Sequence, residues 1–168
     1  ARDEADAAGS PALVARALGL AGVATAKRGD YERGLATVRS GLSLALEHEL
    51  TKEAAEVYQR LGTALESAAE YAGARDALDT AIGLCERSGD EGQEEGCVAC
   101  MAYVLRELGD WDRAAELARE LVGAEPGPGT LVVADGVLGA IEGFRGNARR
   151  ARPLLERSLS TALRLGVI

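Results

Sequence analysis

The residues with the most distinctive chemistry in this chain are its three cysteines, Cys85, Cys97 and Cys100. Cys97 and Cys100 are separated by two residues, a spacing found in redox pairs and in half of a four-ligand zinc site. The one histidine, His48, is remote in sequence, so no metal site is predicted. On a helix Cys97 and Cys100 share a face, so both can be small core residues. A redox pair, or a disulfide from Cys85 to one of the two, is the alternative.

No other group of residues predicts catalysis. No Ser, Asp or Cys is placed by the sequence to activate His48, whose protonated form would favour a helix C-terminus. Acidic pairs such as Glu94 and Glu95 are frequent, but nothing indicates the perturbed pair that acid–base catalysis needs. Residues 123–129 are rich in glycine but lack the Lys-Ser/Thr ending of a phosphate-binding loop. We therefore expect no catalytic residues, no cofactor and no enzymatic activity.

The charge balance is acidic, with 19 basic and 27 acidic residues and a net charge of −8. Such a balance argues against a general nucleic-acid surface, so we expect no direct contact with nucleic acid. Arg149, Arg150 and Arg152 form a small basic run. This run predicts a helix surface with local ion pairs, and the alternative is contact with phosphate or an acidic partner.

Targeting signals are not visible in the sequence. No stretch of about 18 apolar residues is without charges, so no membrane span is predicted. Arg2, Asp3, Glu4 and Asp6 stand where a signal peptide would need apolar residues. A cytoplasmic location is therefore expected. The start at Ala1 and the stop after a helical pattern suggest a piece of a longer protein.

A recurring turn predicts the elements that position these residues. The turns begin at positions 29, 69, 109 and 146, so the intervals between them are 40, 40 and 37. A small residue follows each turn at the same distance, and another precedes it by seven positions. The residues that follow are Gly34, Ala74, Ala114 and Ala151, and those that precede are Gly22, Gly62, Ala102 and Gly139.

The physical roles of these residues predict helix-turn-helix pairs. Small residues let two helices touch, glycine ends the first helix, and Asp30, Asp110 and Asn147 can cap the second. We expect an all-α fold, a right-handed α-solenoid of about four pairs in one domain, 1–168. The pairs lie near 11–48, 51–88, 91–123 and 128–165. The expected helices are 11–28, 31–48, 51–68, 71–88, 91–108, 111–123, 128–145 and 147–165.

This order of small residue, Gly-Asp or Gly-Asn, aromatic and alanine resembles the tetratricopeptide repeat, whose usual period is about 34 residues. Residues 56–66 and 100–114 further resemble the repeat region of large LuxR-type bacterial transcription regulators, including the maltose-activator-like group. In that group an ATPase module precedes the repeats and a helix-turn-helix DNA-binding domain follows them. The resemblance implies a regulatory region that takes an inducer or a partner.

Stacked helix pairs curve, and the first helix of each pair is expected to line the concave surface. Outward positions there predict a site for a protein, a peptide or a small-molecule inducer, although an ordinary wet groove would look similar. These positions are Gln59, Thr63, Glu66, Tyr103 and Arg106. A general adaptor unrelated to transcription is the competing function. The apolar ends of the repeat array also predict a homodimer formed through those ends.

The cysteines provide a direct test of the two interpretations given above. If all three are small core residues, a thiol reagent added to folded protein reacts slowly, and equally with and without prior reduction. Titration of the thiols in native and denatured protein measures this. A reductant-dependent gain of two reactive thiols would establish the redox pair, whereas three reduced and unreactive thiols would contradict it.

Overall fold

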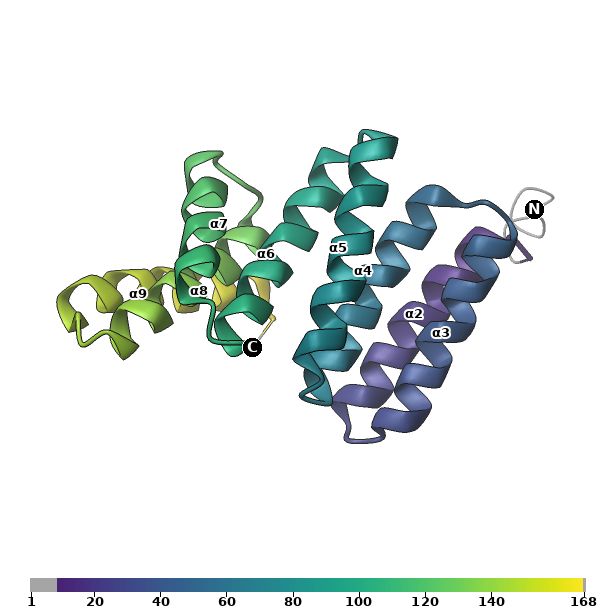
Figure 1. Ribbon diagram of the computed structural model, residues 1–168, viewed down its shortest axis with the longest axis horizontal. Helices are drawn as coiled ribbons and strands as arrows, with labels where there is room; N and C mark the ends of the chain where they lie inside the picture. Colours follow the sequence, from purple (N-terminus) through teal and green to yellow (C-terminus); the bar gives the residue numbers. More distant parts are fainter. Residues whose placement is uncertain (1–8, 168) are drawn as a thin grey trace. The chain divides into compact units, whose positions relative to one another are not determined.

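The computed structural model describes residues 9–167, and helices are the only regular elements in that range (Figure 1). The eight predicted helices are confirmed with nearly the predicted bounds. They are α2 (Pro11–Lys27), α3 (Tyr31–Glu47), α4 (Thr51–Ser67), α5 (Tyr71–Ser88), α6 (Glu91–Glu107), α7 (Trp111–Gly123), α8 (Pro128–Phe144) and α9 (Ala148–Leu165). None of the helices in the part described is long and apolar enough to cross a bilayer.

The same kind of turn occurs between pairs of helices as well as within each pair. Positive φ angles occur at evenly spaced positions, namely Gly29, Glu49, Ala69, Gly89 and Gly109. After the last four of these residues, the next backbone N–H donates back over the helix end, as Glu70 does to the Leu65 carbonyl at 2.9 Å. This is the usual left-handed helix ending. The chain is therefore built from a module of one helix and one short turn.

The shorter interval between the last two predicted turns has a local cause. Helix α7 has 13 residues, whereas α6 and α8 have 17 each. The left-handed residue after α7 is Glu125, which therefore follows Gly109 after a shorter step than the earlier ones. The next left-handed residue, Gly146, follows a helix of the usual length. The short α7 thus accounts for the reduced interval seen in the sequence.

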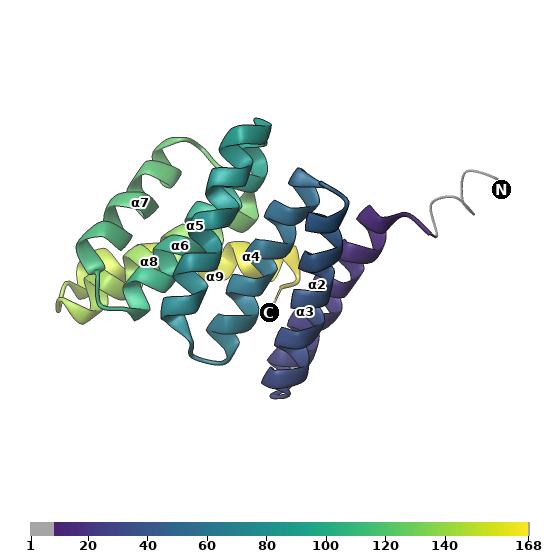
Figure 2. The ribbon, with the colours of Figure 1, turned by 45° about the vertical axis from the view of Figure 1, so that its right-hand side comes forward.

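The chain forms two compact units that divide within α6, one up to Glu94 and one from Glu95 onward. In the first unit α2 packs on α3 and α4 packs on α5, while α4 also contacts both α2 and α3. Figures 1 and 2 show these four helices side by side and antiparallel in sequence order. In the second unit α8 packs on both α7 and α9. Within each unit, neighbouring helices in sequence pack on one another, as in a tetratricopeptide-like solenoid.

Small residues bring α2 and α3 into backbone contact. A Cβ atom added to Gly22 would lie 2.4 Å from the Val38 side chain and 2.7 Å from the Gly34 carbonyl oxygen. A Cβ atom on Gly34 would lie 2.7 Å from the Ala26 nitrogen, and one on Gly41 would lie 2.7 Å from the Ala15 oxygen. The predicted role of the small residue at position 34 is confirmed, and the recurring small residue at position 22 lies in the same contact.

The core of each unit is made of small side chains. The largest side chains that are fully buried are aliphatic, led by Leu78, Ile141 and Val38. In the second unit, buried alanines of α6 and α7 form one cluster with Val137, Leu138 and Ile141 of α8. Trp111 stacks on Phe144 at this unit, with ring centroids 5.5 Å apart. Short side chains throughout allow the helices to approach closely.

Two of the three predicted caps are confirmed, and one is wrong. Asp30 accepts a hydrogen bond from the Arg33 backbone N–H at 3.4 Å, and Asp110 accepts one from Arg113 at 3.3 Å. The Asn147 side chain makes no cap hydrogen bond on α9. Its amide instead donates to the Glu142 carboxylate at 2.9 Å. A hydrogen bond to an ionised acceptor is stronger than one to a neutral group, which favours this geometry over the cap.

The contact at Gly22 can be tested against an uncrowded helix glycine. We expect Gly22→Ala to lower the free energy of unfolding by about 1–2 kcal/mol, because the added methyl group overpacks the α2–α3 contact. At Gly83 of α5 the nearest atom to an added Cβ is the tip of Arg87, 3.5 Å away. Gly83→Ala should raise stability by about 0.5–1 kcal/mol through helix propensity. Urea unfolding followed by circular dichroism measures the free energy of unfolding of both variants. A change of the same sign and size in the two would contradict the close contact at Gly22.

Candidate binding face

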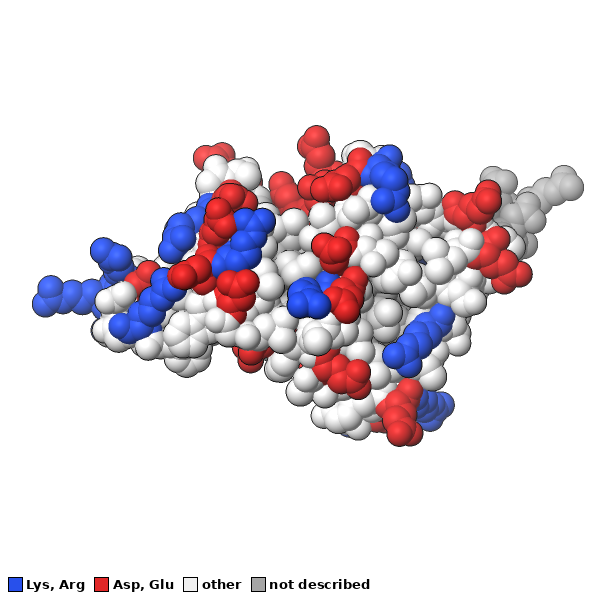
Figure 3. Space-filling view, viewed as in Figure 1, with Lys and Arg blue, Asp and Glu red and all other residues white. Residues whose placement is uncertain are grey.

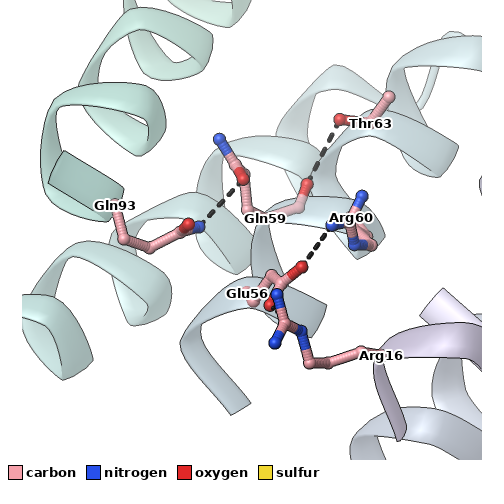
Figure 4. A network of polar contacts seen from close by, with 6 residues as sticks. All are labelled: Arg16, Glu56, Gln59, Arg60, Thr63 and Gln93. Atoms are coloured by element: carbon pink, nitrogen blue, oxygen red, sulfur yellow. Dashed lines mark hydrogen bonds and ion pairs between the residues drawn. The ribbon is translucent and has the colours of Figure 1, made fainter. Parts of the chain in front are cut away.

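Polar side chains from three successive first helices meet in the first unit (Figure 4). Arg16 comes from α2, Glu56 and Gln59 come from α4, and Gln93 comes from the first turn of α6. The spacing of 56, 59, 60 and 63 keeps these α4 side chains on one face of the helix. Gln59 and Thr63 of this face are among the residues predicted from the sequence as binding residues.

Glu56 is the centre of the charged part of this face. Its Oε2 atom lies 2.7 Å from Arg16 Nε, and its Oε1 atom pairs with Arg60 of the next turn. The Glu56 side chain is only 16% exposed, against 50% for Arg16. A carboxylate with so little water needs opposite charges nearby, and two arginines provide them. The pairing also fixes the orientation of both guanidinium groups.

Arg60, the second partner of Glu56, has a polar atom that is buried in the part of the chain described here. Its Nε–H is shielded from water and has no hydrogen-bond partner among the described residues. The aliphatic part of Arg60 packs over Gly19 of α2, where an added Cβ would lie 2.8 Å from Arg60 Cδ. The glycine therefore makes room for the arginine, whose charged end lies at the Glu56 carboxylate.

A glutamine pair links α4 to α6 on the same face. Gln93 Nε2 donates to Gln59 Oε1 at 2.9 Å. The Thr63 hydroxyl donates to the Gln59 carbonyl at 3.3 Å, one turn along the helix. Asp90 holds the start of α6 by accepting from the Gln93 backbone N–H at 3.2 Å. The glutamines are therefore placed by helix geometry and by a capping residue.

A hollow of about 390 Å³ lies beside this network. Its lining combines positive, negative and amide side chains, namely Arg16, Lys52, Glu53, Glu56, Asp90 and Gln93, with Gly92. Such a lining offers both donors and acceptors of hydrogen bonds. It can hold a polar segment of chain or a small polar molecule, because both have backbone or hydroxyl groups to pair.

The five residues predicted from the sequence divide between the two units. Gln59, Thr63 and Glu66 are half-buried on α4, and the first two are hydrogen-bonded to each other. Tyr103 and Arg106 lie on the part of α6 that belongs to the second unit. The Arg106 guanidinium lies over the Tyr103 ring at 4.5 Å from its centroid. Its Nε also donates to Glu107 at 3.0 Å.

Sequence reasoning missed the charged residues Arg16, Glu56 and Arg60 of this face, and the neutral Gln93 beside them. The positions 52, 56, 59 and 63 nevertheless show the signal in α4. Spacings of three and four residues place polar side chains in one row on a helix. Pairing with Arg16 could not be read from such spacing, because it depends on the packing of α2 on α4.

The cysteines and the basic run lie elsewhere. Cys85 and Cys97 are buried and Cys100 is half-buried, as expected for small core residues. Between residues 9 and 167 no three His, Cys, Asp or Glu side chains are grouped as metal ligands. Figure 3 shows acidic and basic side chains interspersed, with basic ones gathered near the turn before α9. Of the basic run, Arg152 pairs with Glu156 at 2.7 Å.

The second unit contains a buried ion pair that the sequence analysis did not single out. Asp135 of α8 is fully buried, and both of its oxygens accept from Arg157 of α9. The hydrogen bond to Asp135 is the main cause of the raised pKa of the Arg157 guanidinium. The stability that this ion pair adds to the folded protein is lost only as the pH rises through the raised pKa of Arg157. The arginine therefore keeps its charge, and the pair persists, at neutral pH. The corresponding residues of the other first helices are Leu18, Tyr58 and Val98.

The helix pairs, their left-handed turns and their small-residue contacts define a tetratricopeptide-like helical repeat. No family model matches the sequence, and no curated protein matches it. Among solved structures, the chain is similar to BtubC (BKLC) from P. vanneervenii, with a TM-score of 0.71 and 15% identity over 94% of this chain. The chain spans 66% of that protein's structure. It is also similar to MamA, with a TM-score of 0.51 and 18% identity over 88% of this chain and 97% of MamA. Both likenesses concern the fold.

The buried pair can be compared with an exposed one in the same unit. We expect Asp135→Asn to lower the free energy of unfolding by about 1–3 kcal/mol, because buried charge-assisted hydrogen bonds are lost. Asp112, whose side chain is 95% exposed, pairs with Arg145. Asp112→Asn should change stability by less than about 1 kcal/mol. Trp111 is the single tryptophan and lies in this unit, so its fluorescence in urea reports the transition. Equal losses in the two variants would contradict the assigned role of Asp135.

Proposed function

We propose that this chain is a non-catalytic repeat scaffold that binds a protein or a peptide on the face formed by α2, α4 and the start of α6. The observation that carries the proposal is the hollow beside the Arg16–Glu56–Arg60 network. Its side chains come from three successive first helices, so a ligand lying across them contacts several repeats at once. Such a surface suits an extended segment of chain.

The interactions within this face favour recognition without much rearrangement. Glu56 is held between two arginines, and Gln59 is held by Gln93. Side chains that are already fixed lose less entropy when a ligand binds, so more of the interaction energy appears as affinity.

Two settings for such a scaffold remain proposals. In the first, the chain is the regulatory region of a cytoplasmic LuxR-type transcription regulator, where a small-molecule inducer or a partner protein occupies the face. In the second, it is an adaptor that assembles proteins without any link to transcription. An ATPase module before the repeats and a helix-turn-helix domain after them in the full-length protein would support the first. Unrelated flanking domains would support the second.

Binding to this face can be tested by a thermal-shift screen with short peptides, sugars and nucleotides. We expect at least one peptide to raise the melting temperature. Glu56→Gln should weaken the binding of that peptide by about tenfold, because the two arginines lose the negative carboxylate that holds both of them. Asp76→Asn is the matched control, since Asp76 pairs with Arg75 on the exposed surface of α5 in the same unit. Calorimetric titration of the three proteins gives the affinities.

The outcomes distinguish the two kinds of ligand and the absence of any ligand. A sugar or nucleotide that binds, and that Glu56→Gln weakens, would favour the inducer-binding region. A peptide whose affinity falls equally in both variants binds at some other surface and would contradict the assigned face. If no member of the panel raises the melting temperature, the inducer-binding hypothesis is contradicted. An adaptor that recognises only a folded protein is then favoured.

A further inference from the structure

The turn between α8 and α9 begins with an exposed aromatic side chain. Phe144 is the last residue of α8 and is 67% exposed. It precedes the left-handed residue Gly146 by two positions, and at the other three predicted turns the corresponding residues are polar. These residues are Lys27, Ser67 and Glu107. Single exposed apolar residues are common on protein surfaces, so the neighbours of Phe144 decide its role.

A second aromatic ring lies against Phe144. Trp111 stacks on it, with ring centroids 5.5 Å apart and ring planes inclined by 21°. The Trp111 indole N–H donates to the Arg106 carbonyl oxygen at 3.1 Å, which fixes the orientation of that ring. Two stacked rings of fixed orientation offer a rigid apolar contact, and aromatic residues are enriched at protein interfaces for this reason.

The first turn of α9 adds two positive charges beside these rings. Arg149 and Arg150 are exposed, and neither forms an ion pair with a residue in the range 9–167. In α3 and α7 the same two positions carry one acid and one arginine, so their charges cancel. These are Glu32 with Arg33 and Asp112 with Arg113. Positive charge is unfavourable at a helix N-terminus, so the two arginines cost α9 stability, as is typical of residues placed for binding.

The exposure of these arginines does not depend on where the described chain ends. Helices α3 and α7 are each followed by another helix, and their two corresponding positions are exposed as well. Phe144 lies on α8, which α9 already follows. A helix that followed α9 as α4 follows α3 would therefore leave both arginines and the two rings open to a partner.

The arginines also border a hollow of about 480 Å³. Its volume lies within the range of ligand sites, about 300–1,000 Å³. It is lined by Gly146, Asn147, Ala148, Arg149 and Arg150. Phe144 and Arg150 are six positions apart, so even an extended chain between them would span only about 20 Å. A peptide of a few residues can therefore reach both the rings and the arginines.

We propose that Trp111, Phe144, Arg149 and Arg150 form a turn surface that docks an acidic segment of a partner protein. In this segment aspartate or glutamate stands near an apolar side chain. The apolar side chain packs on the two rings, and the carboxylates pair with the two guanidinium groups. The turn surface belongs to the second unit and the proposed binding face to the first, so this inference does not rest on the proposed function.

A protein segment suits the turn surface better than a nucleic acid does. Aromatic rings and arginines also bind single-stranded nucleic acid, which stacks its bases and pairs its phosphates. However, Arg145, the nearest further positive charge, is already paired with Asp112 at 2.5 Å. A strand with a phosphate at every nucleotide needs a longer basic row, which a chain with a net charge of −8 does not offer here.

Selection from a display library of random peptides tests the proposal. We expect enriched peptides to combine aspartate or glutamate with an apolar residue. For a synthetic copy of such a peptide, Arg149→Gln and Arg150→Gln should each weaken binding by about fivefold, and Phe144→Ser by about tenfold. Arg113→Gln is the matched control, because Arg113 has the same repeat position as Arg150 but pairs with Glu116. Fluorescence anisotropy of the labelled peptide gives the affinities.

Two further variants make the outcomes unambiguous. Phe144→Tyr retains the ring and should retain the affinity, which separates a lost contact from a lost fold in Phe144→Ser. Glu56→Gln alters the binding face of the first unit and should leave the affinity unchanged. Acidic peptides that only Glu56→Gln weakens would support that face and overturn the present proposal.

Other results would also contradict the turn surface. These are a selection that enriches no peptide, enriched peptides without acidic residues, and equal losses in Arg113→Gln and Arg150→Gln. A thymidine oligonucleotide provides the last comparison. If it binds the original chain and the turn-surface variants weaken it, the surface is a nucleic-acid site and the proposal is overturned.

Discussion

Contact between helix backbones, which small side chains permit, is the interaction on which the rest of this structure depends. At Gly22, Gly34 and Gly41 the α2 and α3 backbones are so close that a single added carbon would lie within 3 Å of an atom of the other helix. Glycine lowers helix propensity, yet it allows dispersion contacts along the whole length of two helices. The regular 17-residue helices on either side keep these contacts in register.

The same close approach explains where polar groups are placed. The small residue Gly19 of α2 leaves space for the stem of Arg60, and this brings the guanidinium to Glu56. In the second unit Asp135 occupies a position where the other first helices have uncharged residues, and Arg157 compensates its charge. Both of these carboxylates therefore have a partner from a neighbouring turn or helix, as the cost of burying a charge requires.

The helices and their pairing could be predicted from the sequence because both follow local rules. Turn residues and small residues recur at fixed distances, and the helix bounds follow from them. Side-chain contacts across helices were harder to predict. The pairing of Arg16 with Glu56 depends on how α2 packs on α4, and Asn147 bonds to Glu142 because a nearby carboxylate competes with the helix end. Residues at outward positions of α4 were identified by helical phase, whereas the arginines that complete the face were not.

Three of the left-handed turn residues have side chains, namely Glu49, Ala69 and Glu125, with φ between 54° and 59°. This conformation costs such residues about 1 kcal/mol, which glycine avoids. After Glu49 and Ala69, hydrogen bonds over the helix end, such as Leu50 to Ala45 at 2.9 Å, hold the reversal in place although neither residue is a glycine. The direction of the chain is thus determined by geometry and residue size more than by residue identity. Distantly related chains can retain this path after most of their individual amino acids have been exchanged.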